Sequence, residues 1–295
     1  MKNKSEKNNM ESQSSSHHPI ALSFDLEYWW CSELLRNVHR EEKIEIIEEA
    51  THQALDLLDK HNRKSTFFVL GSAAKKHPDL IRHIHQRGHE IAAHSYSHRN
   101  IFELTPQEFE EDLKKTTEIL TSITSEKPIG YRAPNFSFDQ NTNWVYGILK
   151  RFGYKYSSSV FPFKTKLYGL PKAPLSPYSP SPSDLTLPDP QGQFIEFPAT
   201  VLKVLGKNIP VSGGIYFRLL PVSFTKFALK RIIKERPAIF YLHMRDLHEH
   251  VPRIKRLSFE ARIIHYFGLK NAIKKFECLL KHFEFKAVID VLGLT

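Results

Sequence analysis

The chain has 295 residues, of which 41% are hydrophobic and 25% are charged, and its formal net charge is +10 at pH 7. This composition is typical of a globular protein and excludes a collagen-like or fully disordered chain. The positive charge favours acidic partners such as phosphate-bearing substrates or an anionic membrane face. No zinc-finger, helix-turn-helix or interleaved basic and aromatic pattern is present, so we expect no nucleic-acid partner.

The cysteine count, the absence of long apolar runs and the N-terminal segment bear on the expected cellular compartment. The chain has two cysteines, Cys31 and Cys278, too few for a disulfide framework. It has no run of 18 apolar residues, so no membrane-spanning helix is predicted. Residues 1–18 are polar and lack the apolar centre of a signal peptide, which predicts a disordered tail before one domain at 19–295. We therefore expect a cytoplasmic protein, with peripheral association at the inner membrane as one option.

The first half of the chain alternates between short β-rich runs and segments with helical spacing of apolar residues. The predicted order is a strand at 20–29, a helix at 41–62, a strand at 65–71, a helix at 77–88, a strand at 89–95 and a helix at 105–124. Thr105 and Glu108 form a capping box around Pro106 at the start of the last helix. This alternation predicts parallel strands joined by crossover helices, in an α/β layer or barrel.

The second half continues the pattern less regularly. Its predicted elements are strands at 128–138, 154–163, 194–206 and 238–243, helices at 141–152 and 224–236, and an amphipathic helix followed by a short strand over 262–293. Residues 168–190 are rich in proline and serine, and proline cannot take part fully in a strand ladder. We expect an ordered loop beside the substrate there, with an inert linker as the alternative.

Five polar residues fall at the carboxyl ends of predicted strands. They are Asp25, Glu27, His94, His98 and His243. In parallel α/β folds, functional groups gather at this edge of the sheet, so side chains distant in sequence can meet there.

His94 and His98 are spaced as metal ligands on one side of a helical turn would be. Alone, the pair is equally well explained as a polar face, because the chain has 16 histidines. Neutral imidazole suits zinc, and two histidines with one carboxylate leave a coordination position for chemistry. Asp25 and Glu27 point to the same side of a strand, so one could bind metal while the other acts as a base. The residues leave open which carboxylate does which.

Two further residues can complete such a site. Arg132 could orient a base carboxylate, form a structural ion pair or bind an anionic group of the substrate. His243 could donate a proton to a leaving group, because the ordinary pKa of histidine is about 6.5, or it could be a structural core residue. His89 is offset from the pair on the same predicted strand, and we interpret it as structural.

The segments "SFDLE", "HEIAAHSYSH", "YRAP" and "FYLH" resemble the successive motifs of the NodB-homology polysaccharide deacetylases, carbohydrate esterase family 4. The flanks and the part after about residue 160 resemble the exopolysaccharide-biosynthesis branch of the XrtA/PEP-CTERM type, which carries a DUF3473 region. The resemblance extends from Ile20 to Leu294.

This resemblance implies a distorted (β/α) barrel of about seven parallel strands. It implies metal-dependent removal of the acetyl group from an N-acetylhexosamine unit of a bacterial exopolysaccharide or its lipid-linked precursor, with zinc as the expected metal. By position, the implied catalytic residues are the base Asp25, the orienting Arg132 and the acid His243. The implied metal ligands are Glu27, His94 and His98.

Three departures from the family pattern leave alternatives open. Glu27 stands one position beyond the commoner aspartate, so Asp25 and Glu27 could exchange roles. Ser157 stands where the aspartate partner of the acid histidine is expected, and "YLHMRDLH" replaces a "YLHPWE"-like segment. A hydrolase of small amides and a catalytically impaired glycan-binding relative are the alternative functions.

Three aromatic residues follow the first predicted strand. Tyr28, Trp29 and Trp30 could stack on sugar faces, and core packing is the equal alternative for at least one of them.

Overall fold

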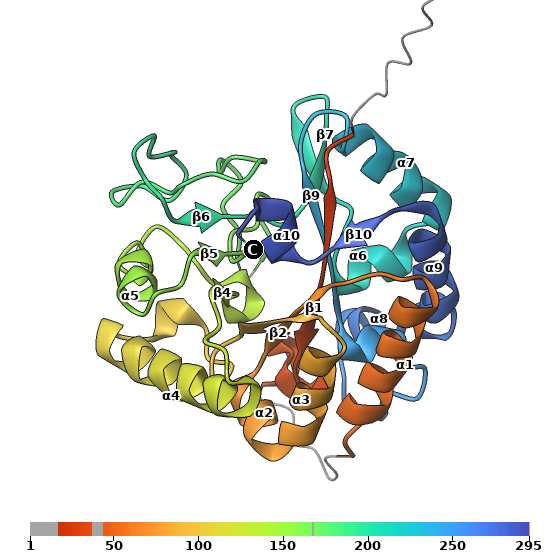
Figure 1. Ribbon diagram of the computed structural model, residues 1–295. Helices are drawn as coiled ribbons and strands as arrows, with labels where there is room; N and C mark the ends of the chain where they lie inside the picture. The colour runs from red at the N-terminus through yellow and green to blue at the C-terminus, as the bar shows by residue number, and fades with distance from the viewer. Residues whose placement is uncertain (1–16, 37–43, 167, 295) are drawn as a thin grey trace, which may run out of the picture.

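The computed structural model describes residues 17–36, 44–166 and 168–294 (Figure 1). The strands are β1 (Ile20–Leu26), β2 (Thr66–Val69), β3 (Glu90–Ala93), β4 (Gly130–Tyr131), β5 (Tyr156–Ser157), β6 (Ile195–Glu196), β7 (Val201–Val204), β8 (Lys207–Pro210), β9 (Ala238–His243) and β10 (Phe285–Lys286). The helices are α1 (Ile47–Lys60), α2 (Gly71–Lys76), α3 (Pro78–Gln86), α4 (Pro106–Thr124), α5 (Val145–Arg151), α6 (Gly214–Leu219), α7 (Val222–Ile232), α8 (Phe259–Tyr266), α9 (Leu269–His282) and α10 (Val288–Leu292).

The main sheet confirms the predicted α/β architecture. Its strands are all parallel and run β9–β1–β2–β3–β4–β5–β6, while β10 pairs with the first two residues of β1. The sheet curls into an incomplete barrel, and no strand pairing among the described residues joins β6 to β9. Between these two ends, the backbone N–H of Ile239 donates to the hydroxyl of Thr200 at 2.7 Å.

Strand β1 lies at the centre of the fold, with one wholly apolar face and a second face that carries Ala21, Ser23 and Asp25. All seven are buried, as expected for a parallel strand that is covered on both sides. Phe24 stacks on Phe67 of β2 at 5.1 Å between ring centroids and meets the edge of Phe276 of α9 at 5.8 Å. Figure 1 shows α2, α3 and α4 on one flank of β1 and α1, α8 and α9 on the other. This burial fixes the position of the residues at the end of β1.

The helices confirm several predicted boundaries and correct others. The capping box of Thr105 and Glu108 is present at the start of α4. Helix α1 begins later than predicted, at Ile47, and just before it the carbonyl of Ile44 accepts a hydrogen bond from the Trp29 indole at 2.8 Å. The predicted C-terminal helix is broken at Gly268, whose φ is +77° and whose missing Cβ would lie 2.8 Å from the carbonyl oxygen of Arg218.

The predicted strands of the second half are too long. Of 128–138 and 154–163, only the two-residue strands β4 and β5 are regular. The segment 194–206 divides at Pro198 into β6 and β7, because proline has no N–H for the ladder. Strand β7 then pairs antiparallel with β8 in a hairpin outside the main sheet.

The proline-rich segment is ordered, and part of it pairs with β6. Tyr178 pairs with Glu196 beside β6, and its hydroxyl donates to the carbonyl of Leu185 at 2.5 Å. Most of the predicted N-terminal tail, residues 1–16, lies outside the described residues. Within the part of the chain that is described, no helix has the length and apolar character needed to cross a bilayer.

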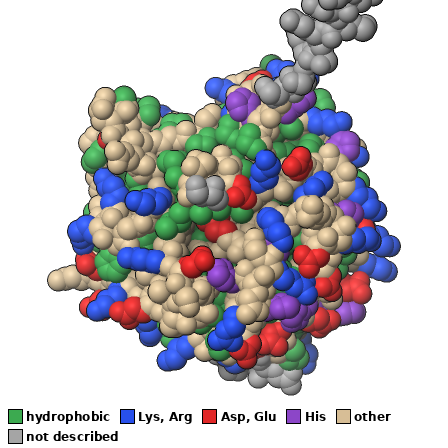
Figure 2. Space-filling model, in the orientation of Figure 1, with side chains coloured by type: hydrophobic (Ala, Val, Ile, Leu, Met, Phe, Trp, Pro, Cys, Tyr) green, Lys and Arg blue, Asp and Glu red, His purple; other side chains and the backbone are tan. Residues whose placement is uncertain are grey.

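The net positive charge is dispersed on the visible face. Figure 2 shows Lys and Arg side chains intermingled with Asp and Glu side chains across that face. This mixture gives no extended single-sign surface there of the kind that would steer a large polyanion.

Candidate active site

The structure brings the predicted polar residues together at the carboxyl edge of the sheet. Asp25 and Glu27 lie at the end of β1, and His243 lies at the end of β9, directly opposite Asp25 in the strand register. His94 follows β3 and Arg132 follows β4. The parallel register therefore delivers all of these side chains to one place, as the sequence predicts.

Asp25 and Arg132 form a buried ion pair. Nη1 of Arg132 donates to Oδ1 of Asp25 at 2.6 Å. The same guanidinium donates to the carbonyl and the hydroxyl of Ser158, each at 3.0 Å, and lies 4.0 Å from the centre of the Phe68 ring. These contacts fix one oxygen of Asp25 and direct the other, Oδ2, toward His243 at 3.7 Å.

Glu27 faces the two predicted metal histidines. Its Oε2 lies 2.5 Å from Nε2 of His98 and 3.4 Å from Nε2 of His94. Burial alone would raise the pKa of Glu27, but the charge and hydrogen bond of His98, with contributions from His94 and His243, hold this pKa well below its ordinary value. Glu27 is therefore favoured as the carboxylate anion, with two imidazole nitrogens within 3.4 Å of it.

His94 has the tautomer of a metal ligand. Its Nδ1 donates to the carbonyl of Arg132 at 2.8 Å, so in the neutral imidazole the lone pair lies on the buried Nε2. That Nε2 has no hydrogen-bond partner within the described part of the chain. It faces the carboxylate of Glu27. A nitrogen lone pair and a carboxylate oxygen that face each other are both electron-rich, so a cation between them would stabilise the arrangement. The residues therefore fit a divalent metal, with the carbonyl of Arg132 orienting the ligand.

The connection between the two histidines differs from the prediction. It is not a helical turn, because Ser95 and His98 both have left-handed backbones, with φ of 62° and 57°. Asp112 of α4 holds the turn by accepting from the N–H of Tyr96 at 2.7 Å and from the N–H and hydroxyl of Ser97 at 3.1 and 2.7 Å. The spacing brings the imidazoles together, but through a turn that another helix stabilises.

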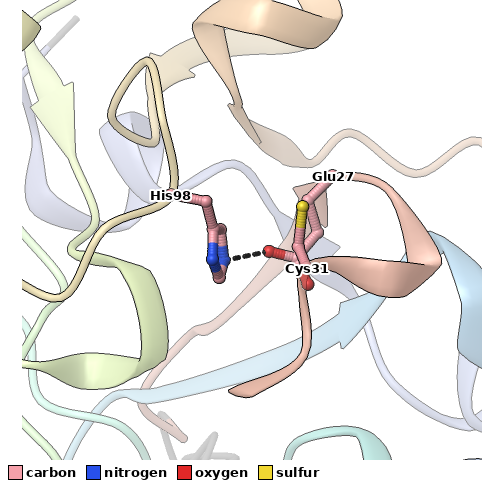
Figure 3. Close-up of side chains that lie close together, drawn as sticks. All are labelled: Glu27, Cys31 and His98. Atoms are coloured by element: carbon pink, nitrogen blue, oxygen red, sulfur yellow. Dashed lines mark ion pairs between the residues drawn. The ribbon is translucent and has the colours of Figure 1, made fainter. Parts of the chain in front are cut away.

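Sequence reasoning missed a third candidate ligand beside Glu27. Cys31 lies on a short 3-10 helix that follows β1, Trp29–Cys31. One donor atom each of Glu27, Cys31 and His98 lie within 4.8 Å of one another (Figure 3). The signal in the sequence was a thiol four residues after Glu27, at a predicted strand end.

His243 is oriented by a carboxylate that the sequence analysis also missed. Its Nδ1 donates to Oδ2 of Asp246 at 3.1 Å, and its Nε2 faces Asp25 at 3.7 Å and Glu27 at 3.9 Å. Burial alone would lower the pKa of His243, but the hydrogen bond and charge of Asp246 and the two active-site carboxylates raise it. His243 is thus favoured in its protonated form.

Asp246 occupies a fully buried ionic site. Nε of Arg218 donates to its Oδ1 at 2.9 Å, and neither side chain has measurable exposure. Burial alone would raise the pKa of Asp246, but Arg218 and His243 hold it below its ordinary value. Ser157 does not contact His243; its hydroxyl donates to Ser159 at 2.7 Å. The carboxylate expected at residue 157 is therefore replaced by one in the "HMRD" segment, three residues after His243.

A cleft of about 730 Å³ opens from Glu27 and His243. Its walls are formed largely by residues beyond 158, including the aromatic side chains of Phe163, Tyr168, Tyr216 and Tyr241 and the cationic side chains of Lys164, Lys166 and Arg245. Of the proline-rich segment 168–190, only Tyr168 contributes to these walls.

The aromatic residues after β1 do not line this cleft. Trp29 is buried in the core, and Tyr28 and Trp30 stack on each other at 4.5 Å. His89 lies at the opposite end of β3 from His94, where its Nδ1 accepts from the N–H of Ser65 at 3.2 Å and burial lowers its pKa to about 4. These contacts support a structural role for His89.

Two family models together match almost the whole chain. The model described as polysaccharide deacetylase matches residues 12–157, and the model described as DUF3473, a domain of unknown function, matches residues 158–293.

Among curated proteins, a peptidoglycan-N-acetylglucosamine deacetylase from Bacillus cereus is 40% identical over 86 residues, which are 29% of this chain and 31% of that protein. A peptidoglycan deacetylase from Helicobacter pylori is 33% identical over 106 residues, 36% of this chain and 35% of the relative. A chitooligosaccharide deacetylase from Rhizobium leguminosarum is 39% identical over 72 residues, 24% of this chain and 34% of the relative. The matches span about a third of each relative's length.

Solved structures share the fold at low identity. A protein assigned as a polysaccharide deacetylase from Mycobacterium smegmatis superposes with a TM-score of 0.63 at 18% identity, over 95% of this chain and 91% of that one. A CE4-family pseudoenzyme from Bacillus anthracis gives a TM-score of 0.52 at 15% identity, over 94% of this chain and 66% of that one. The curled parallel sheet is thus the fold of this group of structures.

Proposed function

The chain belongs to the polysaccharide deacetylase family, through residues 12–157, and continues into a DUF3473 domain; from this premise we propose that it is a metal-dependent polysaccharide N-deacetylase. It hydrolyses the acetamido group of an N-acetylhexosamine unit and releases acetate and a free amino sugar. The observation that carries the proposal is the meeting of the Asp25–Arg132 pair, the Glu27–His98 pair and the His243–Asp246 pair at one edge of the sheet.

Glu27, His94 and His98 are the proposed ligands of a divalent metal, with zinc as the expected ion. The lone pair of His94 Nε2 and the low pKa of Glu27 support this assignment. When bound, such a metal supplies a Lewis acid that polarises the amide carbonyl and makes water a stronger nucleophile.

Asp25 is the proposed general base. Arg132 holds one of its oxygens, and the other remains directed toward the site, where it can take the proton of the attacking water. This division of roles follows from the contacts, because Glu27 has the two imidazoles within 3.4 Å and Asp25 has the guanidinium instead.

His243 is the proposed general acid. Asp246 accepts from Nδ1 and, with the other carboxylates, favours the imidazolium form, in which Nε2 also carries a proton that can pass to the leaving amine. The raised pKa of His243 supports this role at neutral pH, because an acid must hold its proton until the C–N bond breaks.

The cleft supports a glycan as the substrate. Aromatic walls such as those formed by Tyr168 and Tyr216 suit sugar faces, and Lys164 can meet an anionic group, whereas Lys166 is paired with Glu260 at 3.0 Å. We propose an exopolysaccharide or its lipid-linked precursor, whose pyrophosphate Lys164 would contact, processed at the cytoplasmic face of the inner membrane.

Acetate release tests the proposal directly. Full-length protein with added zinc is assayed for acetate from N-acetylglucosamine oligomers, with His94→Ala as the variant and the surface substitution His85→Ala as its control. We expect the wild type and H85A to release acetate, and H94A to lose at least about a thousandfold in rate together with its zinc, because metal chemistry carries several kcal/mol of the barrier. Acetate release by H94A at the wild-type rate would refute the metal-dependent mechanism.

Two alternatives make different predictions in the same assay. A hydrolase of small amides would cleave monomeric amides faster than oligomers. A glycan-binding relative without activity would retain oligomers and release no acetate; its main support was Ser157, and the Asp246 contact to His243 weakens that argument.

A further inference from the structure

Cys31 lies where a metal ligand would lie, although the chemistry proposed above does not use it. Its Sγ is within 4.8 Å of ligand atoms of both Glu27 and His98, and Figure 3 shows the thiol beside the Glu27 carboxylate. Two donors on one tetrahedral zinc, with bonds of about 2.0–2.3 Å, lie roughly 3.3–3.8 Å apart. The observed spacing is within a small side-chain movement of that geometry.

An independent observation, on a histidine outside this group of three, indicates that a cation fits beside Glu27. His94 is 1% exposed, its Nε2 has no hydrogen-bond partner among the described residues, and that atom faces Glu27 at 3.4 Å. A buried lone pair directed at a carboxylate is costly unless a positive ion lies between them.

We propose that Cys31 is a ligand of the same metal, which gives the ion four protein donors, Glu27, His94, His98 and Cys31. This inference rests on the metal site of the proposed function and adds a sulfur to it. On coordination the S–H bond breaks, its proton passes to solvent, the sulfur lone pair forms the bond to the metal, and nothing is oxidised or reduced.

A thiolate among the four proposed metal ligands would have two consequences. It selects thiophilic ions such as zinc and cobalt over magnesium and manganese, because sulfur is a soft ligand. With four protein donors, a bound ion would have no open position for water or substrate, so turnover would require the sulfur to leave or the coordination number to rise to five.

Cobalt substitution provides a readout that does not depend on activity. Cobalt(II) bound by a thiolate gives a near-ultraviolet charge-transfer band, whereas its visible d–d bands appear with nitrogen and oxygen donors alone. Cobalt is titrated into full-length wild type, C31A, C31S and the matched control C278A, which removes the other cysteine of the chain.

We expect the charge-transfer band in the wild type and in C278A, and its loss in C31A and C31S with the d–d bands retained. The zinc dissociation constant should rise at least about tenfold in C31A, since even loss of an outer partner of a ligand costs that much. Visible bands without a charge-transfer band in the wild type, or a band that persists in C31A and C31S, would overturn the role of Cys31 and leave the metal site intact. Absence of all cobalt bands in the wild type would overturn the metal site itself.

Discussion

The two parts of the sheet edge that meet at the site are built differently. Before residue 158, the functional side chains are fixed by partners far away in sequence, as Asp25 is by Arg132. After residue 158, His243 is fixed by Asp246, its neighbour three residues on. The residues proposed as base and metal ligands therefore depend on the packing of several strands. The proposed acid, His243, depends mainly on its neighbour Asp246, which one buried arginine, Arg218, holds in place.

This contrast can be tested first on the base. Asp25→Asn keeps the shape of the side chain but removes its charge, so we expect activity to fall by about 10²–10⁴-fold, the usual contribution of a general base. Zinc binding should be retained, because Glu27 and not Asp25 faces the histidines. Steady-state rates of acetate release and metal content together check this, with the exposed Asp79→Asn as control. Loss of zinc from D25N would show that the two carboxylates have the opposite roles.

The acid side should respond to Asp246 with a smaller loss and a change in pH dependence. In Asp246→Asn we expect kcat to fall by about 10–100-fold, because His243 loses the carboxylate that orients it and raises its pKa. The protonated form of His243 is lost as the pH rises through its pKa. A lower pKa therefore moves the basic limb of the pH–rate profile to lower pH.

Ser157→Ala is the matched control for that experiment. Its hydroxyl contacts Ser159 and not His243, so the pH–rate profile should stay that of the wild type. An unchanged basic limb in D246N, or a shifted one in S157A, would contradict the replacement of the expected partner by Asp246.

The smallest effect on activity is expected from a substitution in the cleft, whose walls are formed largely by residues beyond 158. Tyr216→Ala removes one aromatic wall, and we expect KM for acetylated oligomers to rise about 5–10-fold with kcat little changed, a loss of roughly 1 kcal/mol. Phe227→Ala, an exposed aromatic outside the cleft, is the control. Equal KM values for Y216A and the wild type would argue that the substrate does not extend along this wall.

The order of elements and the meeting of the motifs were predictable because parallel strands deliver their carboxyl ends to one edge. Asp25, Glu27, His94, Arg132 and His243 all arrive there. The form of the His94–His98 connection was not predictable from spacing, since Asp112 on the following helix stabilises left-handed residues that a helical pattern does not include.

The contacts of Asp246 with His243 and with Arg218 were not predicted from the sequence pattern. A carboxylate was expected at residue 157, but the carboxylate that contacts His243 is Asp246 of the "HMRD" segment, three residues further on. The fully buried Arg218 that holds Asp246 comes from a helix 28 residues earlier in sequence, and only the packed structure brings the two together. The strands predicted at 128–138 and 154–163 were too long, because side chains accept the next N–H groups: the Ser159 hydroxyl accepts from Ala133, and the Glu196 carboxylate accepts from Ser159 and Val160.

The position of β1 between β2 and β9 has a consequence for biosynthesis. The strand that carries Asp25 is synthesised well before its second neighbour, β9, which ends only at His243. Until then, one edge of a largely apolar strand that is buried in the folded protein has unpaired N–H and C=O groups, and such edges allow nascent chains to pair with each other. Folding of this protein during translation should therefore depend on chaperones that shield that edge while the intervening residues are made.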